Sequence, residues 1–402
     1  MADERARHEH HRRAADIVPT APDGILTATR GVHAPPEMRD GHKARWFVVV
    51  VLVAMLCLVA AVGAVNAVVD PYGTLNTGVV GPAVWTDRQQ KTQLIDRLKA
   101  APQTVILGSS RSLKMEPSYL GGLIGRRGFN AGVSNGTPVD AYAFVRYLQD
   151  RFPAARPTYL WLLDQEAFAD NDLDPGLVAD PKLSAYLPGT LRFKQYATDL
   201  SWLFSWTSLR TSIDSLMHQG ASAPSPSPSP SKTAQKRTDS AVFAPDGFRS
   251  YDFHDKKRAE GYTLAQGLKD SFKTFGRRYR SNFPGLAATP RRYFERALAL
   301  MNDQGVRPVI VLTPVHPKLL AKLRPLGWTK RHRQVLDYLH SLQKDYDFVL
   351  LDYSTIDSFG GRPADFYDGV HMTVPNTRRL LRAVAGDQAA REALQGRTPT
   401  GQ

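Results

Sequence analysis

Cysteine is almost absent from this sequence: Cys57 is the only one among 402 residues. One thiol cannot form a disulfide within the chain, so the fold must rely on its hydrophobic core for stability. The sequence also lacks the spacings of a zinc site, a phosphate-binding P-loop and a dinucleotide-binding glycine fingerprint, and it has no internal repeat. We therefore expect neither a metal nor an organic cofactor.

The sequence has one long apolar run. Residues Trp46 to Val65 carry no charged side chain, and about 20 apolar residues match the hydrocarbon thickness of a bilayer. The apolar part of a cleaved signal peptide is usually only about 7–15 residues, although small residues around Ala64 to Ala67 resemble a processing site. The run favours an uncleaved transmembrane helix, with a cleaved signal peptide as the alternative.

Charge is distributed unevenly around this run. Arg39, Lys43 and Arg45 precede it, whereas Asp70 follows it. Because cationic residues are retained on the cytoplasmic side, this asymmetry predicts a cytoplasmic N-terminus and an extracytoplasmic main domain.

Composition divides the chain into parts. Residues 1–45 lack a sustained apolar period and predict a disordered cytoplasmic tail, and residues 46–69 form the expected transmembrane helix. Residues 70–395 are expected to form one extracytoplasmic domain. A Ser/Pro-rich insertion at residues 221–238 interrupts it, since alternating Ser and Pro tolerate neither a helix nor a core.

Two kinds of apolar segment alternate after residue 86. Apolar residues at helical spacing predict amphipathic helices, and short continuous apolar runs predict buried strands. Such alternation is typical of a three-layer α/β fold, in which helices cover both faces of a mostly parallel sheet. The expected helices lie at residues 86–99, 134–148, 291–304, 330–344 and 376–384, and the expected strands at 104–107, 159–163, 308–312 and 348–352.

Residues with nucleophile, base and carboxylate chemistry follow this pattern in two places. The strand at 104–107 runs into Gly108-Ser109-Ser110-Arg111, which places the Ser110 hydroxyl on a turn. Near the C-terminus, Asp368-Gly369-Val370-His371 can supply a base and its orienting carboxylate from one loop. The pairing indicates ester chemistry; the alternatives are a capping role for Ser110 and an ordinary polar loop.

These blocks resemble the SGNH (GDSL-like) hydrolases and O-acyltransferases, here in a membrane-anchored form. Gly108-Ser109-Ser110 is similar to the family's Gly-Asp-Ser, and Asp368 to His371 is similar to its terminal Asp-x-x-His. Residues 129–137 resemble its second block, and the resemblance covers residues 102–385 in the family's order. It implies an SGNH/flavodoxin-like fold with Ser110 as nucleophile, His371 as base and Asp368 as its partner.

The resemblance also implies which groups would stabilise an oxyanion. Backbone N–H groups at Ser110 and at Asn135 or Gly136 are the expected donors, and the Asn130 amide is expected to fix the loop. The family's third block, Gly-x-Asn-Asp, is replaced by Asp164-Gln165-Glu166. Because that block's Asn would be the third donor, we expect slow hydrolysis, while transfer to a positioned acceptor could still proceed.

The pattern as a whole predicts a membrane-anchored serine esterase or O-acyltransferase that acts on acyl esters of cell-envelope glycans. A non-catalytic SGNH-like scaffold or glycan-binding protein of envelope assembly is the alternative, motivated by the replaced third block. Arg111 either binds a substrate anion or pairs with a neighbouring carboxylate. Asp164 and His316 are further candidates for the substrate-binding wall of the site.

The chain is basic, with a formal net charge of +14. We expect membrane lipid to be a partner through the N-terminal anchor. A basic exported surface either attracts anionic headgroups, an acidic envelope polymer or a glycan, or is simply solvated. Nucleic acid is not expected outside the membrane.

Aromatic residues are concentrated in two further segments that look helical, residues 196–217 and 261–283. The first includes Trp202, Phe204 and Trp206. This pattern leaves three roles open: a lid over the site, an amphipathic membrane-facing element, or ordinary packing in the core.

The first prediction concerns topology. A reporter enzyme that matures only outside the cytoplasm should be active when it is fused after Gly73, because a single span with cations before it exports the chain on its C-terminal side. A reporter that works only in the cytoplasm, fused at the same residue, is the control and should be silent. Cytoplasmic activity at this position would overturn the orientation.

Overall fold

The computed structural model describes residues 40–70, 86–170, 173–191, 203–217 and 242–397. The chain divides into two units, Met1–Leu56 and Cys57–Gln402, with the boundary inside the first helix, and each unit is described by itself. The Ser/Pro-rich insertion expected at 221–238 lies outside the described residues, as do Trp202 and the expected tail as far as residue 39.

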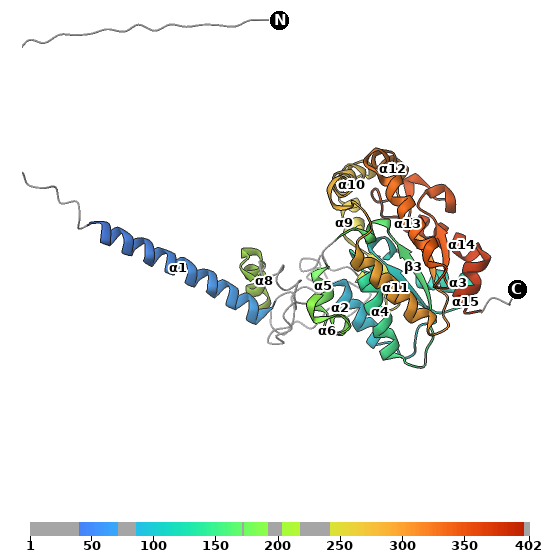
Figure 1. The fold of residues 1–402 in the computed structure, drawn as a ribbon, viewed down its shortest axis with the longest axis horizontal. Helices are drawn as coiled ribbons and strands as arrows, with labels where there is room; N and C mark the ends of the chain where they lie inside the picture. The colour runs from blue at the N-terminus through green and yellow to red at the C-terminus, as the bar shows by residue number, and fades with distance from the viewer. Residues whose placement is uncertain (1–39, 71–85, 171–172, 192–202, 218–241, 398–402) are drawn as a thin grey trace, which may run out of the picture. The chain divides into compact units, whose positions relative to one another are not determined.

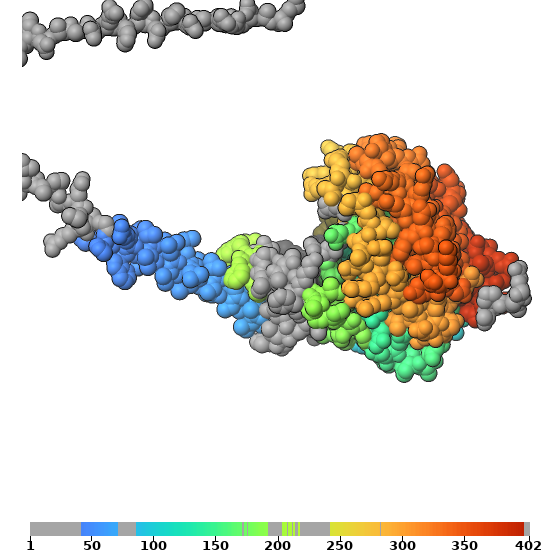
Figure 2. All heavy atoms as spheres, in the orientation of Figure 1, coloured from blue at the N-terminus to red at the C-terminus, as the bar shows by residue number. Residues whose placement is uncertain are grey.

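The first helix, α1 (Asp40–Val69), is long and apolar. Its residues His42–Val69 make it the one helix in the described part of the chain that is long and apolar enough to cross a membrane. Large side chains along it are open, including Trp46 at 68% and Leu56 at 69% exposure (Figure 2). The helix begins earlier than the apolar run because polar residues such as Lys and Arg also sustain helical structure.

A five-stranded parallel sheet forms the centre of the main domain. Its order is β2-β1-β3-β6-β7. The four strands predicted from apolar runs are present, each within one residue of its expected bounds. The fifth strand, β2, has three residues and is too short for a periodicity to reveal. The bounds are Thr104–Gly108 for β1, Gly128–Asn130 for β2, Thr158–Leu163 for β3, Val309–Leu312 for β6 and Val349–Asp352 for β7.

Helices cover both faces of this sheet (Figure 1). Val105 and Leu107 of β1 pack in one apolar cluster, and Ile106 between them packs in the other. One cluster takes in α2 (Asp87–Asp96), α4 (Pro138–Arg151), α11 (Ala288–Asn302) and α13 (Trp328–Leu342); the other takes in α3 (Pro117–Ile124), α14 (Val374–Gly386) and α15 (Gln388–Gln395). The three-layer α/β architecture predicted from the sequence is therefore present.

One helix starts later than its apolar pattern predicts. Helix α4 begins at Pro138, not at Ser134. Thr137 and Asp140 form a reciprocal capping box at its start, and Pro138 occupies the first helical position. Proline is favoured there because its missing N–H has no partner in the first turn anyway. The residues before it are thereby left in a loop beside the site.

Smaller elements follow the third strand and the insertion. Helix α10 packs against α12 in a third apolar cluster that includes Tyr279 and Leu319. These elements are α5 (Pro175–Ala179), α6 (Pro181–Ser184), α8 (Trp206–Met217), β4 (Val242–Phe243), β5 (Arg249–Tyr251), α9 (Phe253–Ala259), α10 (Leu264–Arg277) and α12 (Pro317–Leu323).

Gly108 ends β1 and directs the chain into the Ser110 turn. Its φ of 147° lies in a region that side chains rarely adopt. A Cβ added there would lie 2.6 Å from the carbonyl oxygen of Leu162 in the neighbouring strand. Because the contact is with a backbone atom, the neighbouring strand cannot move aside without disturbing the sheet. Glycine is therefore required at this position both for its positive φ and for the close approach of Leu162.

The second prediction follows from this close approach. Gly108→Ala should lower the free energy of unfolding by roughly 2–4 kcal/mol, since it adds backbone strain and a clash. Gly122→Ala is the matched control: Gly122 lies in α3 with open space around its Cβ position, so alanine there should be neutral or slightly stabilising. Denaturant unfolding of both variants measures the difference, and equal stabilities would refute the argument.

Candidate active site

The carboxyl edge of the sheet brings together residues that are far apart in the sequence. Strands β2 and β3 lie on opposite sides of β1, so the chain reverses its direction of travel across the sheet at this point. Such a switch point leaves a crevice beyond the strand ends, where ligands of open α/β sheets bind. Ser109 and Ser110 follow β1, and Asp164 follows β3, on the two sides of that crevice.

Ser110 and His371 are in hydrogen-bond contact. The Ser110 Oγ lies 2.8 Å from the His371 Nε2, across 261 residues of sequence. His371 Nδ1 lies 2.8 Å from Asp368 Oδ2. An ionised carboxylate can only accept, so Nδ1 carries the proton and Nε2 is free to accept the Ser110 hydroxyl proton. The three predicted residues therefore form a continuous Ser–His–Asp hydrogen-bond chain.

The loop's own backbone fixes the Asp368 carboxylate. Its Oδ1 accepts the N–H groups of Val370 and His371, each at 2.8 Å. Burial alone would raise the pKa of Asp368, but the nearby His371 and the hydrogen bonds from His254 and the loop outweigh it and hold that pKa well below its usual range. Asp368 is thus a fixed anion whose Oδ2 faces the imidazole.

Helix α10 packs closely on this loop. A Cβ on Gly267 would lie 2.7 Å from the Tyr367 carbonyl oxygen, and the Ser271 hydroxyl accepts the Gly369 N–H at 3.0 Å. Residues of α10 also line the cavity over the site. Leu268, Phe272 and Phe275 of α10 also pack against the third apolar cluster. Of the roles left open for residues 261–283, packing in the core is therefore observed, and α10 lines the cavity as well.

The two adjacent serines have different partners. Ser109 Oγ donates to Asp164 Oδ2 at 2.5 Å and accepts the Arg111 backbone N–H at 3.2 Å. It therefore caps the short turn Ser110–Ser112, and its hydroxyl is already engaged in hydrogen bonds to Asp164 and Arg111. Only the neighbouring Ser110 hydroxyl meets a histidine, which distinguishes the candidate nucleophile from its structural neighbour.

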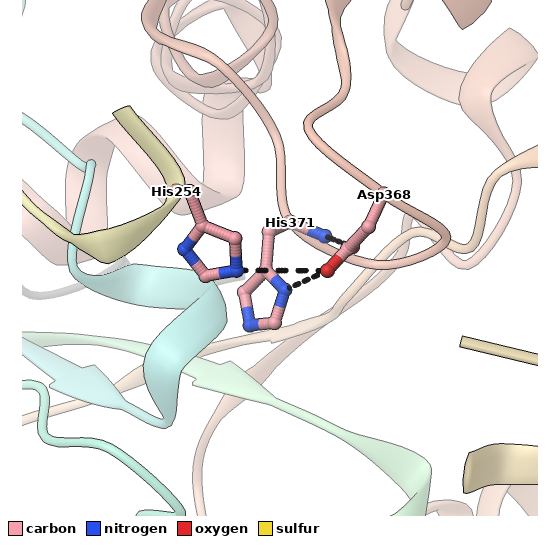
Figure 3. Close-up of side chains that lie close together, drawn as sticks. All are labelled: His254, Asp368 and His371. Carbon is pink, nitrogen blue, oxygen red and sulfur yellow. Dashed lines mark hydrogen bonds and ion pairs between the residues drawn. The ribbon is translucent and has the colours of Figure 1, made fainter. Parts of the chain in front are cut away.

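A second histidine contacts the same aspartate (Figure 3). His254 Nε2 lies 3.6 Å from Asp368 Oδ2, and its Nδ1 lies 3.5 Å from Asp252 Oδ1. The His254 and His371 rings lie side by side with centroids 4.4 Å apart. Burial alone would lower the pKa of His254, but hydrogen bonds and charge from Asp252 and Asp368 outweigh it and raise that pKa to about 9. His254 is therefore a cation at neutral pH.

His254 was missed by the sequence analysis. It lies in the seven-residue helix α9, after the Ser/Pro-rich insertion. Asp252 and Asp255 form a capping box at the start of that helix, and Asp-x-x-Asp before a basic segment is a signal that would have located it. Its approach to Asp368 depends on tertiary folding and has no local pattern.

Two backbone N–H groups near Ser110 are available to an oxyanion. Within the described residues, the N–H groups of Ser110 and Asn135 donate to no other group. The Gly136 N–H donates to the Val133 carbonyl at 3.0 Å. Of the two predicted alternatives, Asn135 is therefore the available donor, and its positive φ of 52° shows a tight turn there.

Asn130 braces the loops on both sides of this turn. Its amide nitrogen donates to the carbonyls of Ser112 and Met115, at 2.8 and 2.9 Å, and its oxygen accepts the Gly132 N–H at 2.8 Å. Asn130 is fully buried. Its amide therefore links the Ser110 turn to the following block, as expected for a residue that fixes the loop.

Arg111 is held by carboxylates. Its guanidinium lies 2.8 Å from Glu166 Oε2 and 3.5 Å from Asp164 Oδ1, and only 4% of the residue is exposed. Asp164 also accepts the Thr313 hydroxyl at 2.7 Å. Of the two roles left open for Arg111, pairing with neighbouring carboxylates is the observed one. Asp164 and Glu166 therefore hold Arg111 beside Ser110.

His316 lies behind the loop that carries Asp368 and His371. Its backbone N–H donates to the Gly369 carbonyl at 2.9 Å, and its ring packs edge-on against Phe366. It caps α12 by accepting the Lys318 N–H at 3.1 Å. His316 does not line the cavity, in contrast to Arg111 and Asp164. The expectation that it forms the substrate-binding wall is not met: it supports the loop.

An open cavity of about 840 Å³ lies over Ser110 and His371. Helices α9 and α10 form much of its wall. Three cations of the wall each lie over an aromatic ring: Lys257 over Phe253 and Tyr262, Arg258 over Tyr367 and Arg278 over Phe275. The cavity is large enough for a drug-sized or oligosaccharide-sized ligand.

His254, Asp368 and His371 also have the composition of a metal site. One ligand atom from each lies within 4.8 Å of the others. A metal bound there would compete with the hydrogen bond that orients His371. Because these same nitrogen and oxygen atoms already pair with one another, their arrangement fits a hydrogen-bonded cluster that holds protons.

Comparison with protein-family models and with curated protein sequences finds no match to this chain.

The third prediction concerns the pH dependence of stability. The pKa of His254 is about 6.5 in the unfolded chain and is raised to about 9 in the folded protein. Between these two pH values the folded protein therefore keeps a proton on His254 that the unfolded chain has lost. Its stabilising contribution is thus fully present below pH 6.5 and is lost as pH rises through 9. Relative to His254→Gln, the wild-type free energy of unfolding should fall by roughly 1–3 kcal/mol over that range.

The control for this experiment is His340→Gln, which changes an exposed histidine on α13. It should retain the wild-type pH dependence. A His254→Gln variant whose stability changes with pH in parallel with the wild type would contradict the pairing of His254 with Asp252 and Asp368.

Proposed function

We propose that this chain is a membrane-anchored serine esterase or O-acyltransferase of SGNH type, with its main domain outside the cytoplasm. One observation carries the proposal: Ser110, His371 and Asp368 form a continuous hydrogen-bond chain with 2.8 Å at each link. A base oriented in this way activates a hydroxyl that is otherwise a poor nucleophile. The open cavity over Ser110 gives an acyl ester access to it.

The first half of the proposed reaction makes an acyl-enzyme. Ser110 Oγ attacks the carbonyl carbon of the acyl ester while His371 Nε2 takes the hydroxyl proton. Asp368 stabilises the resulting imidazolium through Nδ1. The available N–H groups of Ser110 and Asn135 can meet the carbonyl oxygen as it gains negative charge. His371 then gives the proton to the departing alcohol, and the acyl group remains on Ser110.

The second half returns the enzyme to its starting state. His371 takes a proton from water or from an acceptor hydroxyl, whose oxygen attacks the acyl carbon. His371 then gives that proton to Ser110 Oγ as the bond between Oγ and the acyl carbon breaks. Two backbone donors should stabilise the oxyanion less than three, and one lost donor costs about 10²–10³ in rate. A hydroxyl acceptor held in the cavity compensates through proximity, which free water cannot do. This difference favours transfer over hydrolysis.

Acyl esters of cell-envelope glycans are the proposed substrates. The proposal rests on the proposed extracytoplasmic location of the main domain, which is supported by the apolar α1 and the cations before it. An acidic envelope polymer or glycan and membrane lipid are the proposed partners of the basic chain. Cationic side chains in the cavity wall, including Lys257 and Arg258, are compatible with such a ligand.

A non-catalytic scaffold or glycan-binding protein is the second candidate. Asp164 stands where the third donor was expected, and its carboxylate accepts from Ser109 and Thr313. A fixed anion there repels an oxyanion where an amide would stabilise it. The same cavity can bind a glycan without turning it over.

The fourth prediction separates these two candidates. Ser110→Ala, His371→Ala and the double variant should each lower turnover of a small activated acyl ester by at least about 10³-fold. The double loss should hardly exceed either single loss, since the residues act as one unit. Ser109→Ala is the matched control and should keep most of the activity, because its hydroxyl serves the turn. If wild type and Ser110→Ala, both folded, turned over the ester equally fast, the enzyme proposal would be wrong and the non-catalytic candidate would remain.

A further inference from the structure

Exposed apolar side chains concentrate in one short segment outside α1. Among the described residues, eight large apolar side chains beyond α1 are exposed, and five of them belong to the segment 203–217 that contains α8. Their exposed fractions run from 43% to 75%: Phe204 53%, Trp206 71%, Ile213 44%, Leu216 43% and Met217 75%. Isolated exposed apolar residues are ordinary, but five on a single short helix and its entry turn mark an interaction surface.

The sequence of α8 gives the helix distinct sides. Trp206, Ile213 and Met217 recur at helical spacing and share one side. Ser208 and Ser212, one turn apart, form an adjoining side and are buried at 2% and 0% exposure. Arg210 is exposed and lies at the edge of the apolar side, four residues after Trp206 and three before Ile213. Thr207, Thr211 and Asp214 recur at helical spacing on the remaining, polar side. Other residues of the chain therefore cover the serine side of α8. The apolar side stays exposed and is free to contact a partner.

The last turns of α1 cover the serine side. Asn66 of α1 donates from its amide nitrogen to the Leu203 carbonyl at 2.6 Å and accepts the Ser212 hydroxyl at 2.8 Å. Gly63, one turn earlier, is covered by the Phe204 ring. Asn66 is fully buried. A polar amide in an apolar helix is costly in lipid unless it is paired, and here Ser212 of α8 and Leu203 just before α8 supply the two partners.

The length of α1 places this contact near the bilayer surface. The charge-free run from Trp46 to Val65 extends over about 30 Å at 1.5 Å per residue, which matches a hydrocarbon core about 30 Å thick. Asn66 and the residues after it therefore extend into the headgroup region. Tryptophan is enriched at that depth because its ring is apolar and its N–H is polar.

We propose that α8 is an interfacial helix, which inserts its Trp206–Ile213–Met217 side into the lipid at the end of α1, while the long Arg210 side chain at the edge of that side reaches the headgroups. Asn66 holds it there. The occupant of the apolar side is lipid, because the surface continues directly from a helix that is itself open and apolar. Of the roles left open for residues 196–217, this assigns the membrane-facing one to α8. The inference is independent of the proposed enzyme activity.

The test places a nitroxide probe on each side of α8 in the full chain, in lipid nanodiscs of phosphatidylcholine and phosphatidylglycerol. Cys57→Ala first removes the native thiol, and Met217→Cys then carries the probe. Collision rates with oxygen, which concentrates in lipid, and with a water-soluble nickel complex are compared. Thr211→Cys is the matched control, because position 211 lies on the polar side of the helix. The oxygen-to-nickel ratio should be several-fold higher at 217 than at 211.

Equal ratios at both positions, with the nickel complex reaching 217 freely, would overturn the proposal. Nanodiscs with one chain each and with several chains distinguish lipid from a second copy: a high ratio at 217 that needs several chains would also overturn it. Asn66→Leu tests the attachment. Without the two hydrogen bonds the probe at 217 should become more mobile while α1 stays in the membrane. Unchanged mobility would refute the role of Asn66.

Discussion

The position of the Asp368 carboxylate is the constraint on which the site depends. Two loop N–H groups fix one of its oxygens, and the other faces both His371 and His254. Through His371 the carboxylate determines which nitrogen faces Ser110. The loop itself is held from outside, by Ser271 of α10 and by the backbone of His316. If any of these supports moved, the imidazole would lose its orientation toward the nucleophile.

The second histidine changes the electrostatics of that carboxylate. In a site with one histidine, the negative charge of the aspartate stabilises the positive charge of that imidazolium alone. Here His254 lies 3.6 Å from the same oxygen and is cationic at neutral pH, so it shares the charge. The same carboxylate oxygen thus faces the Nδ1 of His371 at 2.8 Å and the Nε2 of His254 at 3.6 Å.

Much of the central fold could be predicted from the sequence, because amphipathic helices and buried parallel strands leave periodic patterns. Ser110, Asp368 and His371 could be predicted for a different reason: their order and the adjoining glycines form short local blocks. Asn135 could be distinguished from Gly136 only in the structure, since the difference is a hydrogen bond to Val133. Arg111 had two chemically valid roles until Glu166 and Asp164 were seen beside it. His254 and the two sides of α8 depend on contacts across more than one hundred residues, such as Asn66 with Leu203, which no local pattern encodes.

The most direct test of the account asks which atom of the protein becomes acylated or phosphonylated. The full chain in detergent is treated with a fluorophosphonate probe, digested, and mapped by mass spectrometry. The account predicts one adduct, on Ser110, and its near-complete loss in His371→Ala, because without the base the hydroxyl is not activated. An adduct on Ser109, or labelling of Ser110 that is equally fast without His371, would contradict the central claim.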